Sequence, residues 1–136
     1  MPGAWLLKTE PSTYSWGDLV RDGKTVWDGV SNAAALINLR AMRTGDEALI
    51  YHSGDGKAIV GIARITRGAY ADPKLKDPKR VVIEVQPVRA LKTPVTLAAV
   101  KAEPALAQLG LVRMSRLSCM PVSAEQRAVL RKLGVR

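Results

Sequence analysis

The stretch ALIYHSGDGKAIVGIARI, residues 48–65, decides the fold. Two apolar runs flank Gly54-Asp55-Gly56, and such runs around a glycine-rich turn predict a β-hairpin. The second run is apolar at almost every position, as expected for a central strand of a sheet or barrel. Gly61 lies in the middle of this run and predicts a bulge or a close approach of another group to the backbone.

Strands and helices mix on both sides of this hairpin without a regular βαβ pattern. Further strands are expected at 5–9, 80–86 and 115–119, the second of them stopped by Pro87. Helices are expected at 15–22, 32–42, 97–101 and 104–109, and a last helix after a capping box formed by Ser123 and Gln126. This mixture predicts an α+β domain around a strongly curved sheet or small barrel, with helices outside.

The chain has 136 residues, and this length predicts a single domain over 1–136 with a real core. No apolar run approaches the roughly 18 residues of a membrane helix. The first residues lack the basic-then-apolar order of a signal peptide, and the one cysteine, Cys119, cannot form an internal disulfide. These features predict a cytoplasmic protein that does not enter a membrane.

The positive charge is concentrated in the second part of the chain. The net charge is +9, yet residues 1–50 carry 5 Lys/Arg against 6 Asp/Glu. Residues 51–136 carry 16 Lys/Arg against 6 Asp/Glu and therefore hold the whole excess. Such a distribution is typical of a protein that binds a polyanion, most simply nucleic acid. An equally good interpretation from charge alone is a solubilising surface.

The stretch VWDGVSN, residues 26–32, is the best candidate for a ligand site. It places the flat ring of Trp27 beside a carboxylate, a glycine turn and the start of a helix. A tryptophan in this position is suited to stacking on a planar ligand, and the helix start offers free N–H groups. The alternative interpretation is that Trp27 is an ordinary core residue.

Several other kinds of site find little support in the sequence. One His and one Cys far apart give no cluster of metal ligands, and Cys119 is expected to be a small core residue. His52 and Ser53 are neighbours in a strand and point to opposite faces, so they form no catalytic pair. The run Gly54-Asp55-Gly56-Lys57 lacks the frame of a phosphate-binding loop.

Two polar motifs lie at the ends of expected strands. Lys8-Thr9-Glu10 comes directly before a proline and is either an exposed strand end or part of a site. Arg116 alternates with Leu117 in the expected strand at 115–119. Its planar guanidinium could hold a phosphate or a base edge, or could form a structural ion pair with a carboxylate such as Glu10 or Asp28.

Five blocks of sequence, taken together and in order, resemble the EVE domain family. They are Trp5-Leu6-x-Lys8-Thr9-Glu10-Pro11-Ser12-x-Tyr14-Ser15, Trp27-Asp28-Gly29-Val30-x-Asn32, Tyr51-His52-Ser53, Val60-Gly61-Ile62-Ala63 and Ser115-Arg116-Leu117-Ser118-x-Met120-Pro121-Val122. The resemblance covers nearly the whole chain. It implies a PUA-like fold, a small β-barrel of about five to six strands flanked by short helices and related to the YTH and ASCH domains.

The resemblance also implies a function and a set of site residues. Family members are thought to bind modified bases in nucleic acid, with a flipped or unpaired base in a pocket beside a basic surface. No metal and no organic cofactor is implied. The residues that match the family's pocket-facing motifs are Lys8, Glu10, Ser12, Trp27, Asp28, Val30, Asn32, Tyr51, His52, Ser53, Arg116 and Ser118.

The chain departs from the family pattern after Val30. Many members carry Arg-Asn-Tyr-Gln-Ala at this point, whereas this chain carries Ser31-Asn32-Ala33-Ala34-Ala35. One basic, one aromatic and one amide side chain are therefore replaced by small ones. The change concerns the choice of ligand and leaves the expected fold unaffected.

We expect from these observations a non-enzymatic protein that binds DNA or RNA and recognises a modified or unpaired base against Trp27. One alternative is a hydrolase acting on nucleic acid, with Lys8, Glu10, His52 and Ser53 as its acid and base groups. Another alternative is a protein-interaction module whose basic face binds an acidic partner.

Overall fold

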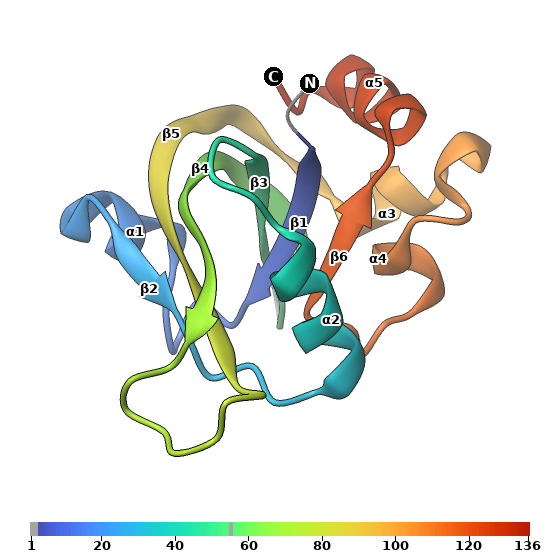
Figure 1. Ribbon diagram of the computed structural model, residues 1–136. Helices are drawn as coiled ribbons and strands as arrows, with labels where there is room; N and C mark the ends of the chain where they lie inside the picture. The colour runs from blue at the N-terminus through green and yellow to red at the C-terminus, as the bar shows by residue number, and fades with distance from the viewer. Residues whose placement is uncertain (1–2, 55) are drawn as a thin grey trace.

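The computed structural model describes residues 3–54 and 56–136 and has an α+β architecture (Figure 1). Its strands are β1 (Ala4–Thr9), β2 (Thr25–Trp27), β3 (Glu47–His52), β4 (Ala58–Ala71), β5 (Val81–Thr96) and β6 (Cys119–Val122). Its helices are α1 (Trp16–Asp22), α2 (Ala33–Ala41), α3 (Leu97–Lys101), α4 (Gly110–Arg113) and α5 (Ala124–Leu133), with a 3₁₀ turn at Pro104–Leu106. The fold class expected from the sequence is confirmed.

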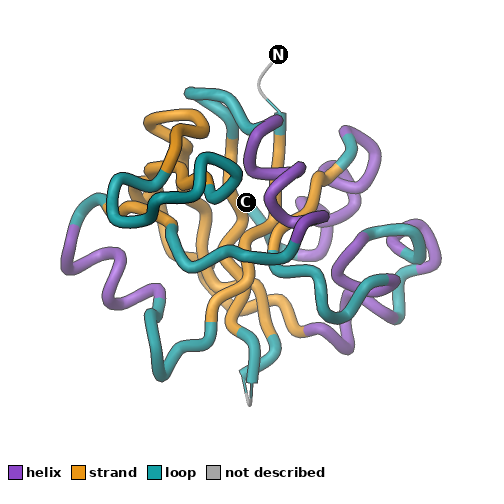
Figure 2. Tube along the Cα trace, turned by 60° about the horizontal axis from the view of Figure 1, so that its bottom comes forward, coloured by secondary structure: helices purple, strands orange, loops and turns teal. Residues whose placement is uncertain are grey.

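The strands form one sheet in the order β2-β5-β4-β3-β1-β6. Strand β1 runs parallel to β3 and antiparallel to the edge strand β6, while β3, β4 and β5 are antiparallel neighbours. The strands lie at the centre of the molecule and the helices lie around them (Figure 2). The sheet is strongly curved. It does not close into a barrel because β2 and β6 remain free edges, so the term barrel describes it only loosely.

The expected hairpin is formed by β3 and β4, which pair from Glu47↔Arg64 to His52↔Ala58. Ile50 pairs with Gly61 and Tyr51 pairs with Ile59, so Val60 is an extra residue in β4. A Cβ atom on Gly61 would lie 2.6 Å from the ring of Trp16. Both alternatives predicted at Gly61, the bulge and the close approach, are therefore present, since the Trp16 ring lies directly on this backbone.

The strand expected at 80–86 does not stop at Pro87, and this prediction was wrong. β5 continues to Thr96, and Pro87 pairs with Ala63 where the register between β4 and β5 shifts. A proline has no N–H to donate, but a bulge leaves a ladder position without a bond, so a proline is tolerated there. The register shifts along β4 and β5 also bend these two long strands around the core (Figure 1).

Two further expectations near the end of the chain need correction. Residues 115–119 are not a strand, because Leu117 N–H closes a turn onto the Met114 carbonyl at 3.0 Å and β6 begins only at Cys119. The helix expected at 104–109 is a single 3₁₀ turn followed by α4. The short strand β2 had no signal in the sequence, since three residues are too few to show a period.

The helix ends follow local rules that the sequence shows directly. Ser15 and Asp18 form the expected capping box of α1, and Gly23 ends that helix with a φ of 75°. Ser123 and Gln126 form the second capping box, at the start of α5. The expected cap at Asn32 is also formed, because its side chain accepts a hydrogen bond from Ala35 N–H at 3.0 Å.

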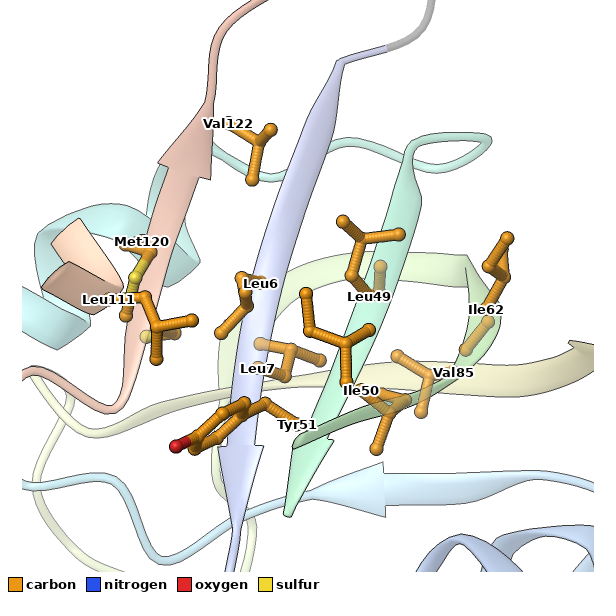
Figure 3. Packing of buried hydrophobic residues seen from close by; sticks show 14 of the residues in the cluster. Leu6, Leu7, Leu49, Ile50, Tyr51, Ile62, Val85, Leu111, Met120 and Val122 are labelled. Atoms are coloured by element: carbon orange, nitrogen blue, oxygen red, sulfur yellow. The ribbon is translucent and has the colours of Figure 1, made fainter. Parts of the chain in front are cut away.

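The core lies between the sheet and its helices (Figure 3). Neighbouring residues Leu6 and Leu7 of β1 are both fully buried, so both faces of this strand are covered. Cys119 is a buried core residue as expected, and its thiol donates to the Ala35 carbonyl. Burial raises the pKa of the Cys119 thiol to about 11, and such a thiol is inert at neutral pH.

Among the helices of the described residues, none is long and apolar enough to cross a membrane. The cytoplasmic location expected from the sequence stays a prediction.

The contact between Trp16 and Gly61 predicts a large effect of a small substitution. Gly61→Ala should lower the free energy of unfolding by about 1–3 kcal/mol, because the new methyl group overlaps a rigid indole ring. The measurement is urea unfolding followed by circular dichroism. Gly17→Ala is the matched control, since its Cβ meets only Ser15 Oγ at 3.5 Å and alanine favours a helix. Equal losses of stability in both variants would contradict the role given to the Trp16 ring.

Candidate functional site

A cavity of about 610 Å³ lies where β1 ends and the edge strand β2 leads into α2. Its lining comes from three parts of the chain, namely residues 8–14 at and after the end of β1, residues 25–32 and Ser118. Lys8 and Thr9 are at the end of β1 because Leu6 and Leu7 hold that strand in the core. The cavity is thus positioned by a strand whose middle residues are fully buried.

Trp27 forms one wall and is fixed on two sides. It pairs with Ile83 at the edge of the sheet, and the residue is 9% exposed. Trp27 therefore belongs to the hydrophobic core, as the alternative interpretation expected, and also contributes to the lining of the cavity. Tyr14 meets it edge-on, with ring centroids 6.3 Å apart and an interplanar angle of 89°. The Tyr14 hydroxyl donates to Asp22 Oδ2 at 2.8 Å, so the position of that ring is fixed in turn. The aromatic wall is therefore rigid before any ligand arrives.

The turn after Trp27 forms the rim of the cavity. Asp28 and Gly29 are exposed, and Gly29 has a φ of 80°, a conformation that glycine adopts without strain. The Val30 carbonyl accepts a hydrogen bond from Arg80 Nε at 3.0 Å, which ties the rim to the start of β5. Asn32 Oδ1 is occupied by its helix cap, so its amide group remains available as a donor toward the cavity.

Lys8 joins the end of β1 to the turn before β6. Its Nζ donates to the Ser115 carbonyl at 2.7 Å and lies 5.9 Å from the centre of the Tyr51 ring. Its backbone N–H donates to the Ser118 carbonyl at 2.8 Å, and this bond brings Ser118 to the cavity. Burial lowers the pKa of Lys8 below its ordinary value. Lys8 therefore has a structural bond as well as a place in the lining.

His52 is not among the lining residues of the cavity. Its Nε2 accepts a hydrogen bond from the backbone N–H of Trp16 at 2.9 Å. Because Trp16 is the first residue of α1, this bond satisfies an N–H group that has no partner inside the helix. Burial lowers the pKa of His52, and the charge of Glu10 opposes the shift. The imidazole is neutral when it makes this bond.

The neighbours of His52 are also engaged in the framework. Tyr51 is buried in the core beneath the end of β1 (Figure 3). Ser53 donates to the Thr9 carbonyl from its backbone N–H at 2.9 Å and from its hydroxyl at 3.3 Å. These bonds hold the chain just after β3 against the end of β1.

The cavity thus brings together part of the site expected from the sequence. The expected residues in its lining are Lys8, Glu10, Trp27, Asp28, Val30, Asn32 and Ser118. The expected residues outside the lining are Ser12, Tyr51, His52, Ser53 and Arg116. Ser12 is exposed and donates to Glu10 Oε1, whereas Arg116 is exposed in the turn at 115–116.

Other residues line the cavity although they are not among the expected site residues. They are Thr9, Thr13, Tyr14, Thr25, Val26, Gly29 and Ser31. Tyr14 could have been found, since it belongs to the same block as Lys8 and Glu10. Val26, Gly29 and Ser31 lie within the candidate stretch at 26–32, whereas Thr25 precedes it in β2, a strand too short to be recognised. Ala33 and Ala34 are exposed at the start of α2 and lie outside the lining.

A lysine-rich loop, residues 72–80, lies beside the rim (Figure 1). Its position is fixed by Arg80 on the Val30 carbonyl and by Arg40 Nη2, which donates to the Lys79 carbonyl at 2.8 Å. Lys74, Lys76 and Lys79 are exposed in this loop. The entrance of the cavity is therefore next to a group of exposed positive charges.

The chemistry of the lining suits a planar polar ligand. It combines an aromatic wall, hydroxyl groups from Thr and Ser residues, amide donors, one lysine and two carboxylates, Glu10 and Asp28. Within 3–54 and 56–136 there is no cluster of three or more His, Cys, Asp and Glu side chains that could hold a metal ion.

Comparison with known proteins gives one consistent group of relatives. The EVE domain matches residues 3–133. Human thymocyte nuclear protein 1 is 34% identical, in a match that covers 90% of this chain and 69% of the human protein. The structure of Rpa0253 from Rhodopseudomonas palustris has a TM-score of 0.91 at 49% identity and covers 97% of this chain and 92% of that one.

Two further structures extend the comparison. The human THYN1 protein, solved in complex with DNA containing 5-methylcytosine, has a TM-score of 0.88 at 31% identity, with 96% of each chain covered. ZmASCH from Zymomonas mobilis is 10% identical with a TM-score of 0.59 and covers 97% of this chain and 99% of that one, a likeness of fold alone.

The bond from Trp16 N–H to His52 predicts a pH-dependent stability. Folding lowers the pKa of His52 below the unfolded value of about 6.5, so the unfolded chain binds the proton more readily. The contribution of His52 is therefore complete above pH about 6.5 and is lost as the pH falls through the folded-state pKa. Urea unfolding between about pH 7.5 and pH 5 measures the loss.

His52→Gln is the control, because a glutamine oxygen can accept the same bond and does not titrate. In this variant the loss of unfolding free energy between about pH 7 and pH 5 that comes from His52 should disappear. His52 is the one histidine of the sequence, so its imidazole NMR signal reports the pKa directly. A folded-state pKa at or above the ordinary value would refute the assignment.

Proposed function

This chain belongs to the EVE domain family, and we propose that it binds nucleic acid by holding a modified or unpaired base in the cavity walled by Trp27. The observation that carries the proposal is the cavity itself. A fixed aromatic wall faces a volume large enough for a planar ring, and a basic loop lies at its entrance. The complex of the related human protein with DNA containing 5-methylcytosine supports the same ligand class.

Each part of the lining has a role in this proposal. Trp27 stacks on the base, a contact worth roughly 1–3 kcal/mol. The Asn32 amide donates to an acceptor on the base. The Ser118 hydroxyl can donate to an acceptor or accept from a donor on the polar edge of the base. A methyl substituent packs against Val26 or Val30 at the rim and contributes about 0.8 kcal/mol per buried carbon.

Positive side chains near the entrance bind the phosphates that flank the base. Lys74, Lys76 and Lys79 are the best placed, because their loop is tied to the rim through Arg80. Arg116 is an exposed second candidate, since the carbonyl of its neighbour Ser115 accepts the Lys8 bond. Such contacts release counterions, so binding weakens as salt rises.

The base must leave its stack before it can enter the cavity. Extrusion from a duplex costs a few kcal/mol and costs least for an unpaired or mismatched base. We therefore expect single-stranded or mismatched sites to bind more tightly than a fully paired site with the same modification.

A hydrolytic function has weaker support. Of the four groups it would use, Lys8 and Glu10 line the cavity, whereas His52 and Ser53 lie outside its lining and hold the framework. A general base must reach the proton it removes, and the His52 Nε2 that would do so is bonded to Trp16. Binding without turnover is the function that this arrangement favours.

Replacement of the aromatic wall tests the proposal. Trp27→Leu keeps an apolar side chain in the core but removes the stacking face, so affinity for a single-stranded oligonucleotide containing 5-methylcytosine should fall about 5- to 150-fold. Fluorescence anisotropy of the labelled oligonucleotide measures it. Trp5→Phe is the control, because Trp5 lies outside the cavity lining and donates to Asp46. An unchanged affinity of the Trp27→Leu variant for this oligonucleotide would contradict the proposal.

Removal of the loop charges tests the phosphate contacts separately. The triple variant Lys74→Ala/Lys76→Ala/Lys79→Ala should weaken binding to modified and unmodified single strands by the same factor. The slope of log K against log salt should fall by up to about 0.7 for each phosphate that the loop no longer neutralises. The assigned role would be contradicted if the variant no longer distinguished the modified from the unmodified oligonucleotide but kept the wild-type salt dependence of binding.

A further inference from the structure

A second concave surface lies at the other end of β1. It is a groove of about 650 Å³ formed by the start of β1, the middle of β4 and β5, and one face of α5. The ribbon places α5 at one end of the molecule and the 28–32 turn at the opposite end (Figure 1). Ala4 lines the groove and Thr9 lines the cavity, and five steps of about 3.3 Å along a strand separate them by roughly 17 Å.

The groove is lined by four arginines and one carboxylate. Arg127 is buried and donates to Glu47 and to the Val135 carbonyl, so it neutralises that carboxylate and fixes the floor. Arg64, Arg89 and Arg131 are exposed around it. In the part of the chain that the structure describes, none of these three forms an ion pair. Arg64 and Arg131 therefore remain available to a ligand, while Arg89 also binds the main-chain oxygen of Arg136 through Nε.

The basic surface continues beyond the groove. Arg89 Nε donates to the main-chain oxygen of Arg136 at 2.8 Å, which joins β5 to the residues after α5. Arg136 lines a neighbouring hollow together with Lys92. An open track of separate, exposed cations suits a chain of phosphates better than a single small anion, because each guanidinium can bind a different phosphate.

We propose that this arginine groove, defined by Arg64, Arg89 and Arg131, binds the sugar–phosphate backbone of nucleic acid independently of the base cavity. That the partner is nucleic acid rests on the proposed function. The position of this second site and its binding of phosphates without recognition of a base go beyond that function. Among the described residues, the lining of the groove offers guanidinium groups and no aromatic side chain, so it can bind phosphates but cannot stack a base. It adds affinity that does not depend on sequence or on modification.

The two sites are electrically separate. Roughly 17 Å is about twice the Debye length of ~8 Å at physiological salt, so charge removed in the groove has little effect on the field at the cavity. This separation allows each site to be tested while the other remains intact.

The test uses the double variant Arg64→Ser/Arg131→Ser, since neither side chain makes a hydrogen bond that the described fold needs. The probe is an unmodified duplex of about 20 base pairs, titrated between about 50 and 200 mM salt. The variant should bind roughly tenfold or more weakly at the lower salt, and the slope of log K against log salt should fall by about 1.8. The matched control is Lys101→Ser/Arg113→Ser, which removes the same charge from α3 and α4.

The outcomes separate the groove from the base cavity. A loss confined to the groove variant supports the proposal, and an equal loss in the control variant, or an unchanged slope in both, overturns it. Titration of 5-methyl-2′-deoxycytidine against tryptophan fluorescence reports on the cavity alone. If that response is absent in the wild type while duplex binding still depends on Arg64 and Arg131, the base-binding proposal fails and the groove stands.

Discussion

The pairing of β1 with β3 on one side and β6 on the other is the constraint on which the rest of the structure depends. Leu6 and Leu7 point to opposite faces and are both fully buried, so helices or curved strands must cover both faces at this point. The two ends of the same strand then reach the surface in two different places. One end lines the cavity walled by Trp27, which we propose binds a base, and the other lines the arginine groove.

The polar residues around the cavity divide into a lining and a framework. Trp27, Asn32 and Ser118 face the space in which a ligand can lie. His52 and Ser53 hold neighbouring elements in place, since one satisfies the first N–H of α1 and the other binds the Thr9 carbonyl. Such a framework keeps the wall in position before binding, so the protein loses less conformational entropy when a ligand binds.

Local features were the ones that the sequence predicted well. The hairpin of β3 and β4 and the helix caps depend on residues a few positions apart, so their signals are complete in a short window. The failures have a different cause. Pro87 lies within β5 because a register shift opposite Ala63 removes the need for its N–H, and that shift depends on the partner strand.

The sequence by itself determined the α+β class and the family and selected Trp27 as a candidate site residue, because each is carried by residue types and short spacings. Only the tertiary structure decided which polar residues meet. Lys8 and Ser115 are 107 positions apart, yet their bond fixes the turn before Ser118. Likewise, the arginines of the groove come from β4, β5 and α5, and no local pattern reveals that they share one surface. Contacts between distant segments form only when the core packs. For this physical reason, the residues that share a site could be identified only from the folded structure.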